Sequence, residues 1–264
     1  MNYIIRLLCL SISISYCLQT NAQGPPITSD KPIMLGGKSI IVKTLTEYRK
    51  TEQGNFWRAP IMAHYLPTSN SLVAVHLPYV SYQFNNSLLE KPNGNTMGDI
   101  EIMAKYQFYR KDEMGKTFRL VAKTLQTLAT GKALGIRGIS TGQYQSYVGI
   151  VAGYESLRYG ISNELGYNVI PNSNENELRY KLGFGLPLLK QSYPVKQLNL
   201  YFEYNSSWLT QRKQYSLYYA QGIQYAIGKF TFELAAQIPF IQYRVPENEH
   251  INYSLFTGMR YVLN

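Results

Sequence analysis

Any enzymatic interpretation of this sequence starts from its three histidines, His64, His76 and His250. A lipid hydrolase would pair one of them with a serine nucleophile and with a third group that orients the ring. In an extended chain, one face recurs at every second residue, and the next such position after His76 is Pro78, not a serine. Leu66 holds the corresponding position after His64. We therefore expect exposed or interfacial histidines, no catalytic residue and no cofactor.

A charged stretch near the C-terminus brings together Glu247, Glu249 and His250, whose side chains are potential metal ligands. Spacing alone is weak evidence, because the sequence offers no second cluster that would complete a coordination shell. A solvated charged loop is the commoner structure for such a stretch. We therefore predict no metal site there.

The elements that carry these residues show an alternation with a period of two, which is typical of strands with one apolar and one polar face. In the stretch 99–109, for example, Ile100, Ile102 and Ala104 alternate with Glu101 and Met103. The same pattern predicts strands at 40–49, 56–65, 72–83, 98–110, 117–129, 144–155, 160–169, 178–188, 197–208, 215–227, 229–240 and 253–263. No stretch has a convincing helical period, so the predicted fold is all-β. Prolines at positions 60 and 78 make the second and third strands the least regular, because proline cannot donate to a strand ladder.

Connections between these strands alternate in length, which distinguishes two all-β architectures. Long gaps, such as 85–97 and 130–143, follow odd-numbered strands, whereas short gaps, such as 111–116 and the turn at Gly228, follow even-numbered ones. An up-and-down antiparallel outer-membrane barrel has this asymmetry, with short periplasmic turns and longer extracellular loops. We predict such a transmembrane β-barrel of about 12 strands, and a secreted β-sandwich is the alternative. The glycine-rich stretch 131–142 has no helix after it for phosphate binding, so we expect a flexible extracellular loop.

Composition agrees with the barrel. Charged residues make up only 16% of the chain, and its 24 tyrosines outnumber 10 phenylalanines. This mixture excludes a disordered chain, and two cysteines are too few for a disulfide scaffold. Half of each barrel strand faces lipid, which limits charge, and tyrosine collects in girdles at the two membrane interfaces.

Residues 1–22 resemble a secretory signal peptide, with a positive charge at Arg6, an apolar core and small residues before a cut after Ala22. A buried N-terminal helix and a lipoprotein cut at Cys17 are the alternatives. Both cysteines would leave with this leader. We expect residues 23–39 to form an N-terminal periplasmic segment or a small plug, and residues 40–264 to form the outer-membrane β-barrel of a Gram-negative cell envelope.

Loss of Arg6 with the leader would leave a net charge of +9, against +10 for the whole chain. Nucleic acid is an unlikely counterpart for an exported chain whose basic residues form no cluster. We expect no nucleic-acid binding. The expected partners are outer-membrane lipids, including lipopolysaccharide phosphates, together with the barrel-assembly machinery during biogenesis and a small-molecule solute of unknown identity.

Strand parity predicts which charged residues face the lumen, because lysine or arginine on the lipid face would cost about 2–4 kcal/mol near the midplane. Such residues either line a pore or pair with one another and fill a narrow lumen. Three tyrosines share the same faces. The lumen-lining candidates are Lys43, Glu47, Glu101, Lys105, Arg119, Lys123, Tyr147, Glu155, Glu164, Arg179, Lys181, Tyr201, Glu203, Tyr218, Glu233 and Arg260.

The stretch Gly98-Asp99-Ile100-Glu101-Ile102-Met103-Ala104-Lys105-Tyr106-Gln107-Phe108 resembles a strand of bacterial outer-membrane barrels of the phenol-degradation MetA-pathway transporter family. Thr130-Gly131 and Leu165-Gly166-Tyr167 are similar in order and spacing. The resemblance covers most of the chain after the leader. It implies uptake of small, often aromatic or apolar compounds by a barrel distantly similar to fatty-acid channels, which carry a larger N-terminal plug. It brings no catalytic residues.

Three functions follow as hypotheses. The first is passive or weakly gated uptake of small, aromatic or amphipathic solutes through a porin-like channel. The second is a structural or surface-interaction barrel with a closed lumen, whose loops 85–97 and 130–143 contact partners. The third is an outer-membrane lipid hydrolase, which the arrangement of histidines and serines favours least.

Overall fold

The computed structural model describes residues 26–32, 37–85, 93–189 and 196–263. The predicted leader, residues 1–22 with its cut after Ala22, lies outside the described residues, as does most of the predicted loop 85–97. Among the described residues, no helix is long and apolar enough to cross a membrane. Regular structure in this part of the chain consists of β-strands and one short 3-10 turn, η3 (Glu247–Glu249).

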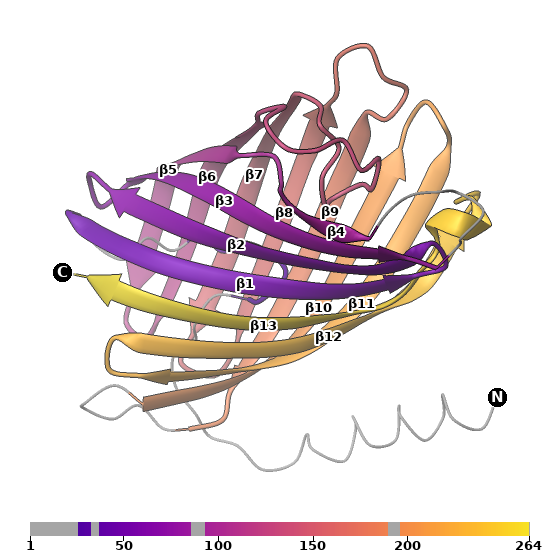
Figure 1. Cartoon of the computed structure of the whole chain (residues 1–264). Helices are drawn as coiled ribbons and strands as arrows, with labels where there is room; N and C mark the ends of the chain where they lie inside the picture. The colour runs from indigo at the N-terminus through magenta and orange to yellow at the C-terminus, as the bar shows by residue number, and fades with distance from the viewer. Residues whose placement is uncertain (1–25, 33–36, 86–92, 190–195, 264) are drawn as a thin grey trace, which may run out of the picture.

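The strands form one antiparallel sheet that closes into a barrel (Figure 1). Closure joins β1 to both β2 and β13, while β2 also pairs with β3. The strands are β1 (Ser39–Thr51), β2 (Gly54–Leu66), β3 (Ser71–Phe84), β4 (Gly94–Met97), β5 (Glu101–Glu113), β6 (Lys116–Thr127), β7 (Gln145–Ser156), β8 (Gly160–Val169), β9 (Glu177–Pro187), β10 (Lys196–Leu209), β11 (Gln214–Ile227), β12 (Phe230–Tyr243) and β13 (Ile251–Leu263). Because β4 and β5 lie one after the other along β3, twelve strand positions surround the barrel. The predicted antiparallel barrel of about twelve strands is confirmed.

Two prolines explain where the ladder is interrupted. Pro60 on β2 lies opposite Pro78 on β3. The β1–β2 pairing skips the positions around Pro60, between the pairs Thr44↔Ile61 and Glu47↔Arg58. On the other side of β3, the gap between β4 and β5 lies beside Pro78. Each proline therefore directs its missing N–H to a place where the sheet has no regular pair, which is how a barrel strand tolerates it.

The gap between β4 and β5 corrects one predicted strand. Residues 98–100, expected at the start of a continuous strand, lie outside the sheet, and β4 falls in the predicted loop 85–97. Asp99 uses this position to hold another part of the chain: its carboxylate accepts the backbone N–H groups of Gly131, Thr141 and Gly142, each at 3.0 Å. A tertiary contact, which local alternation does not encode, decides the conformation here.

The connection between β6 and β7 is consequently folded, and our expectation of a flexible glycine-rich loop is wrong. Leu134, Ile136 and Ile139 in this connection are buried, and they pack against Phe56, Val80 and Tyr82 from β2 and β3. The Ser140 hydroxyl donates to the Lys132 carbonyl at 2.7 Å, and Arg49 donates to the Arg137 carbonyl at 2.7 Å. An apolar cluster and converging hydrogen bonds thus fix this loop at the end of the barrel that carries the longer connections (Figure 1).

The outer face of the barrel is apolar, as the alternation predicts, and the inner face carries the charged side chains together with apolar clusters. On β3, Val73, Val75, Leu77 and Tyr79 are exposed, while the residues between them point inward. Aromatic rings gather outside near both ends of the strands. The ring centroids of Tyr48 and Trp57 are 4.7 Å apart at the loop end, and those of Phe230 and Tyr261 are 4.6 Å apart at the end with the short turns. The barrel therefore has two outer aromatic belts.

We predict that Asp99→Asn loosens the connection between β6 and β7 without opening the barrel. Each N–H bond to a charged acceptor contributes about 1.5–3 kcal/mol, and the substitution removes the charge and one acceptor oxygen. Limited trypsin digestion should then cut after Lys132 and Arg137 about tenfold faster. Asp112→Asn, at the opposite end of the barrel, is the matched control. Equal digestion rates for the two variants would show that Asp99 does not hold this loop.

Candidate functional site

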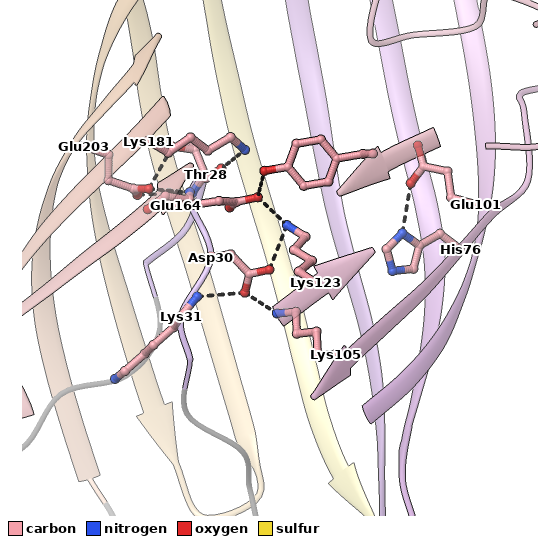
Figure 2. Close-up of polar contacts among 12 residues, drawn as sticks. Thr28, Asp30, Lys31, His76, Glu101, Lys105, Lys123, Glu164, Lys181 and Glu203 are labelled. Atoms are coloured by element: carbon pink, nitrogen blue, oxygen red, sulfur yellow. Dashed lines mark hydrogen bonds and ion pairs between the residues drawn. The ribbon is translucent and has the colours of Figure 1, made fainter. Parts of the chain in front are cut away.

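Residues 26–32, which we call the interior segment, lie inside the barrel against side chains from β5 to β11 (Figure 2). On β10, the Glu203 carboxylate accepts three successive backbone N–H groups, those of residues 27–29, at 2.9, 3.0 and 2.6 Å. The Thr28 hydroxyl donates to the same carboxylate at 2.9 Å. Glu203 is 1% exposed, so these donors replace the water that the buried charge has lost. This one carboxylate fixes the path of the segment's backbone.

Asp30 is the acidic group of the interior segment, and two lysines hold it. Its carboxylate forms ion pairs with Lys105 on β5 and with Lys123 on β6, the latter at 2.9 Å. Burial by itself raises the pKa of the Asp30 carboxyl, but the two ammonium groups outweigh this effect and hold that pKa well below its ordinary value. The segment therefore presents an ionised carboxylate to a pair of lysines at neutral pH.

Further polar groups of the barrel complete this arrangement. Lys123 also donates to Glu164 on β8 at 2.7 Å, and the Tyr147 hydroxyl donates to the same Glu164 oxygen at 2.6 Å. On β9, Lys181 donates to the Thr28 carbonyl at 3.1 Å. Lys31 forms an ion pair with Glu155 on β7. Charges of both signs on the strands thus find partners in the segment, as buried charges require.

Two glycines in the strands make room for the segment. A Cβ on Gly153 of β7 would lie 2.5 Å from the Pro32 ring, and a Cβ on Gly222 of β11 would lie 2.5 Å from the Ile27 side chain. Both distances are shorter than carbon atoms tolerate. Glycine inside a strand often marks the close approach of another backbone. Glycine at these two strand positions is therefore a sequence signal that another segment packs closely there, although it does not identify that segment.

The histidines of β2 and β3 lie in a second interior cluster, and our expectation that they are exposed or interfacial is wrong. His64 and His76 face inward, with ring centroids 5.4 Å apart, and His76 is buried. The His76 Nδ1 contacts the Glu101 carboxylate at 2.9 Å, and Arg58 donates to its other oxygen at 2.5 Å. The alternation along β2 and β3 that turns Arg58 and Leu72 inward also turns these two rings inward.

His250 occupies a different place, in the connection between β12 and β13. Its Nε2 lies 3.0 Å from the Val245 carbonyl, and the neighbouring Glu249 lies 3.5 Å from Arg137. Within the described part of the chain, no group of three or more His, Cys, Asp or Glu side chains is arranged to hold a metal ion.

The sixteen residues selected by parity lie on the inner face, in three groups along the barrel. Lys105, Lys123, Tyr147, Glu155, Glu164, Lys181 and Glu203 surround the interior segment or contact one another beside it. Toward the loop end lie four of the candidates, Glu47, Glu101, Arg179 and Tyr218. The first three form ion pairs there, Glu47 with Arg49, Glu101 with Arg58 and Arg179 with Glu177. Toward the short turns lie Lys43, 3.5 Å from Glu233, together with Arg119 and Arg260, which donates to Thr231. Tyr201 is buried in an apolar cluster with Ile27.

Sequence reasoning missed several members of these networks. Arg49 and Arg58 lie within the predicted strands 40–49 and 56–65, on the same inward parity as Glu47 and His64, and Glu177 lies one residue before the predicted strand 178–188. The same alternation therefore includes the two arginines, and extending the last strand by one residue includes Glu177. Asp30 and Lys31 carried no such signal, because they lie in a segment without regular structure.

Cavities lie at both ends of the interior, and the interior segment lies between them. The cavity at the loop end measures about 300 Å³ and is lined by residues that include Arg49, Arg179 and Tyr218. A hollow of about 330 Å³ opens at the short-turn end, beside Arg119 and Glu155. The cavity beside the segment measures only about 10 Å³, close to the least space that one water molecule needs. The interior is therefore narrow where the segment lies.

No protein-family model matches this chain, and no curated protein sequence matches it. Solved structures do share its fold. An outer membrane channel from Pseudomonas putida F1 aligns with a TM-score of 0.67 and 12% identity, over 90% of this chain and 100% of that one. The porin KdgM, in complex with disordered oligogalacturonate, aligns with a TM-score of 0.52 and 8% identity, over 86% of this chain and 99% of that one. At these identities the likeness shows the fold, that of a barrel found among outer-membrane channels.

We predict that Glu203→Gln releases the interior segment. Outside residues 1–22 the sequence has no cysteine, so a single Ser29→Cys substitution reports exposure of the segment to a membrane-impermeant maleimide. Loss of the charge weakens three N–H bonds of about 1.5–3 kcal/mol each, so labelling should accelerate at least about tenfold. Glu175→Gln, which removes a carboxylate paired with Arg212 outside this cluster, serves as the control. If both backgrounds label at the same rate, Glu203 does not anchor the segment.

Proposed function

We propose that this protein is an outer-membrane channel of a Gram-negative bacterium, for passive or weakly gated uptake of small solutes. One observation carries the proposal: a closed barrel has an apolar outer face, a charged inner face and a cavity at each end. An apolar outside with aromatic belts suits a bilayer, and a polar inside suits a path for solutes. The folds of the Pseudomonas putida F1 channel and of the porin KdgM support the same conclusion.

In this proposal the long connections face the cell exterior, and the short turns face the periplasm. The first residues of β1 pair with the last residues of β13, so both ends of the barrel sequence lie on the periplasmic side. Basic side chains outside the interior networks would meet lipopolysaccharide phosphates. A cleaved leader after Ala22 and insertion by the barrel-assembly machinery belong to the same proposal.

The interior segment acts as a small plug in this proposal. It lies between the two cavities and is held by polar contacts, to Glu203, Lys105 and Lys123 among others, and by apolar packing of Ile27 against Tyr201. Polar contacts exchange with water and with solutes more readily than packed apolar contacts. Displacement of a short segment is thus a simple way to open the path.

Small aromatic or amphipathic solutes fit the inner surface that the sixteen residues form. The path carries both acidic and basic groups, and Tyr147 and Tyr218 add aromatic surface. Such a lining orients a solute that has both polar and apolar parts. The resemblance of residues 98–108 to the MetA-pathway transporter family supports the same class of solute.

A barrel with a closed lumen is the second candidate, and the ion pairs of the interior favour it. Lys31–Glu155, Lys43–Glu233 and Arg58–Glu101 join interior charges to one another along the barrel. Little space remains beside the segment, where Lys31 and Glu155 lie. A lipid hydrolase has less support, because His64 and His76 face the interior rather than the apolar outer surface. The proposal accordingly contains no catalytic step.

Conductance separates the two candidates. We predict that the purified protein conducts ions in planar bilayers, and that deletion of residues 26–32 raises the mean conductance severalfold because the narrowest part of the interior widens. Heat-denatured protein is the control for leakage, and heat-modifiable migration on gels verifies that the variant is folded. A folded protein that conducts neither with nor without the segment would contradict the channel and support the closed lumen.

A further inference from the structure

The Asp30 carboxylate occupies a binding position that the strands build. Lys105 and Lys123 both contact it, although they come from neighbouring strands and their ammonium groups repel each other. Lys123 has Glu164 as a further partner, whereas the ion pair of Lys105 in the described part of the chain is with Asp30. Two lysines that converge on one carboxylate form a site for an anion, whichever molecule supplies it.

The other contacts of the interior segment indicate which further chemical groups an anion bound at this site would have. Beside the lysines, Glu203 accepts hydrogen bonds from backbone N–H groups and from the Thr28 hydroxyl. Lys181 donates to the Thr28 carbonyl at 3.1 Å. Without the segment, Glu203 offers acceptors and Lys181 offers a donor within reach of the Lys105–Lys123 pair. The surface therefore complements a carboxylate at one end and hydroxyl or amide groups along its length.

We propose that the interior segment imitates the solute, and that the channel admits small hydroxylated or amide-bearing carboxylates. Asp30 holds the place of the solute carboxylate, and Thr28 holds the place of its hydroxyl and carbonyl groups. This inference rests on the proposed channel function, and it names a solute class other than the aromatic or amphipathic compounds that the resemblance of residues 98–108 suggests. A solute of this class competes with the segment for the same lysines and so opens its own path, whereas a neutral solute of equal size does not.

Linkage between solute and segment gives the first test. If the solute and the segment compete for Lys105 and Lys123, each weakens the binding of the other by the same factor. Bound solute must therefore increase the fraction of protein in which the segment is released and exposed. The Ser29→Cys protein is labelled with the impermeant maleimide in the presence of gluconate or of its neutral analogue gluconamide. Gluconate should accelerate labelling severalfold and gluconamide should not. Equal effects of the two compounds would overturn the competition.

Uptake into proteoliposomes gives the second test, with radiolabelled gluconate and gluconamide as a matched pair. Asp30→Asn releases both lysines from their internal partner, and should raise gluconate uptake more than gluconamide uptake. In that background, Lys105→Gln or Lys123→Gln should lower the ratio of gluconate to gluconamide uptake about tenfold, the value of one charge-assisted contact. Lys111→Gln, an exposed lysine paired with Glu113 outside the barrel interior, is the control and should leave the ratio unchanged.

The outcomes distinguish this inference from the proposed function. Gluconamide uptake with a ratio that neither lysine substitution changes would leave the channel intact and overturn the carboxylate site. Failure of folded Asp30→Asn protein to take up either compound would remove the channel and the site together. Migration on gels before and after heating establishes folding for each variant, and two separate lysine substitutions guard against the misfolding of one.

Discussion

Closure of the sheet between β1 and β13 is the constraint on which the rest of the structure depends. A closed antiparallel ladder satisfies the backbone on every strand and leaves each strand only an outer and an inner face. Charged side chains of the strands then share one narrow interior, where an unpaired charge is unfavourable. The pairs Lys43–Glu233, Arg58–Glu101 and Lys123–Glu164 follow from this confinement.

An interruption of the strand ladder beside Pro78 leaves backbone and side chains that can hold a loop, which a continuous strand could not do. Pro78 prevents an unbroken strand beside β3, and the chain leaves the sheet between β4 and β5 at that point. Asp99 is thereby free to bind the connection between β6 and β7, which fixes the loop end of the cavity. A backbone defect in one strand thus becomes the anchor for a loop far away in the sequence.

The interior segment both stabilises the barrel interior and occupies the path that a solute would take. Glu203 and Lys105 take their partners from the segment, and Lys181, which lies opposite Glu164 on β8, donates to the segment as well. The same groups that stabilise the closed form are those that an entering solute would contact. Because polar contacts hold much of the segment, a solute with polar groups can compete for them, while the packing of Ile27 against Tyr201 adds to the stability of the closed lumen.

The sequence by itself determined the barrel, because a period of two acts within each strand, connection lengths are read directly along the chain, and neither needs a distant partner. It also determined which residues turn inward, and the same parity within the predicted strands includes Arg49 and Arg58. Only the tertiary structure decided the break at residues 98–100, the fold of the loop beyond β6 and the place of Asp30. These depend on contacts such as that between Ile100 and Thr130, 30 positions apart, and that between Thr28 and Glu203, 175 positions apart, which no local pattern records.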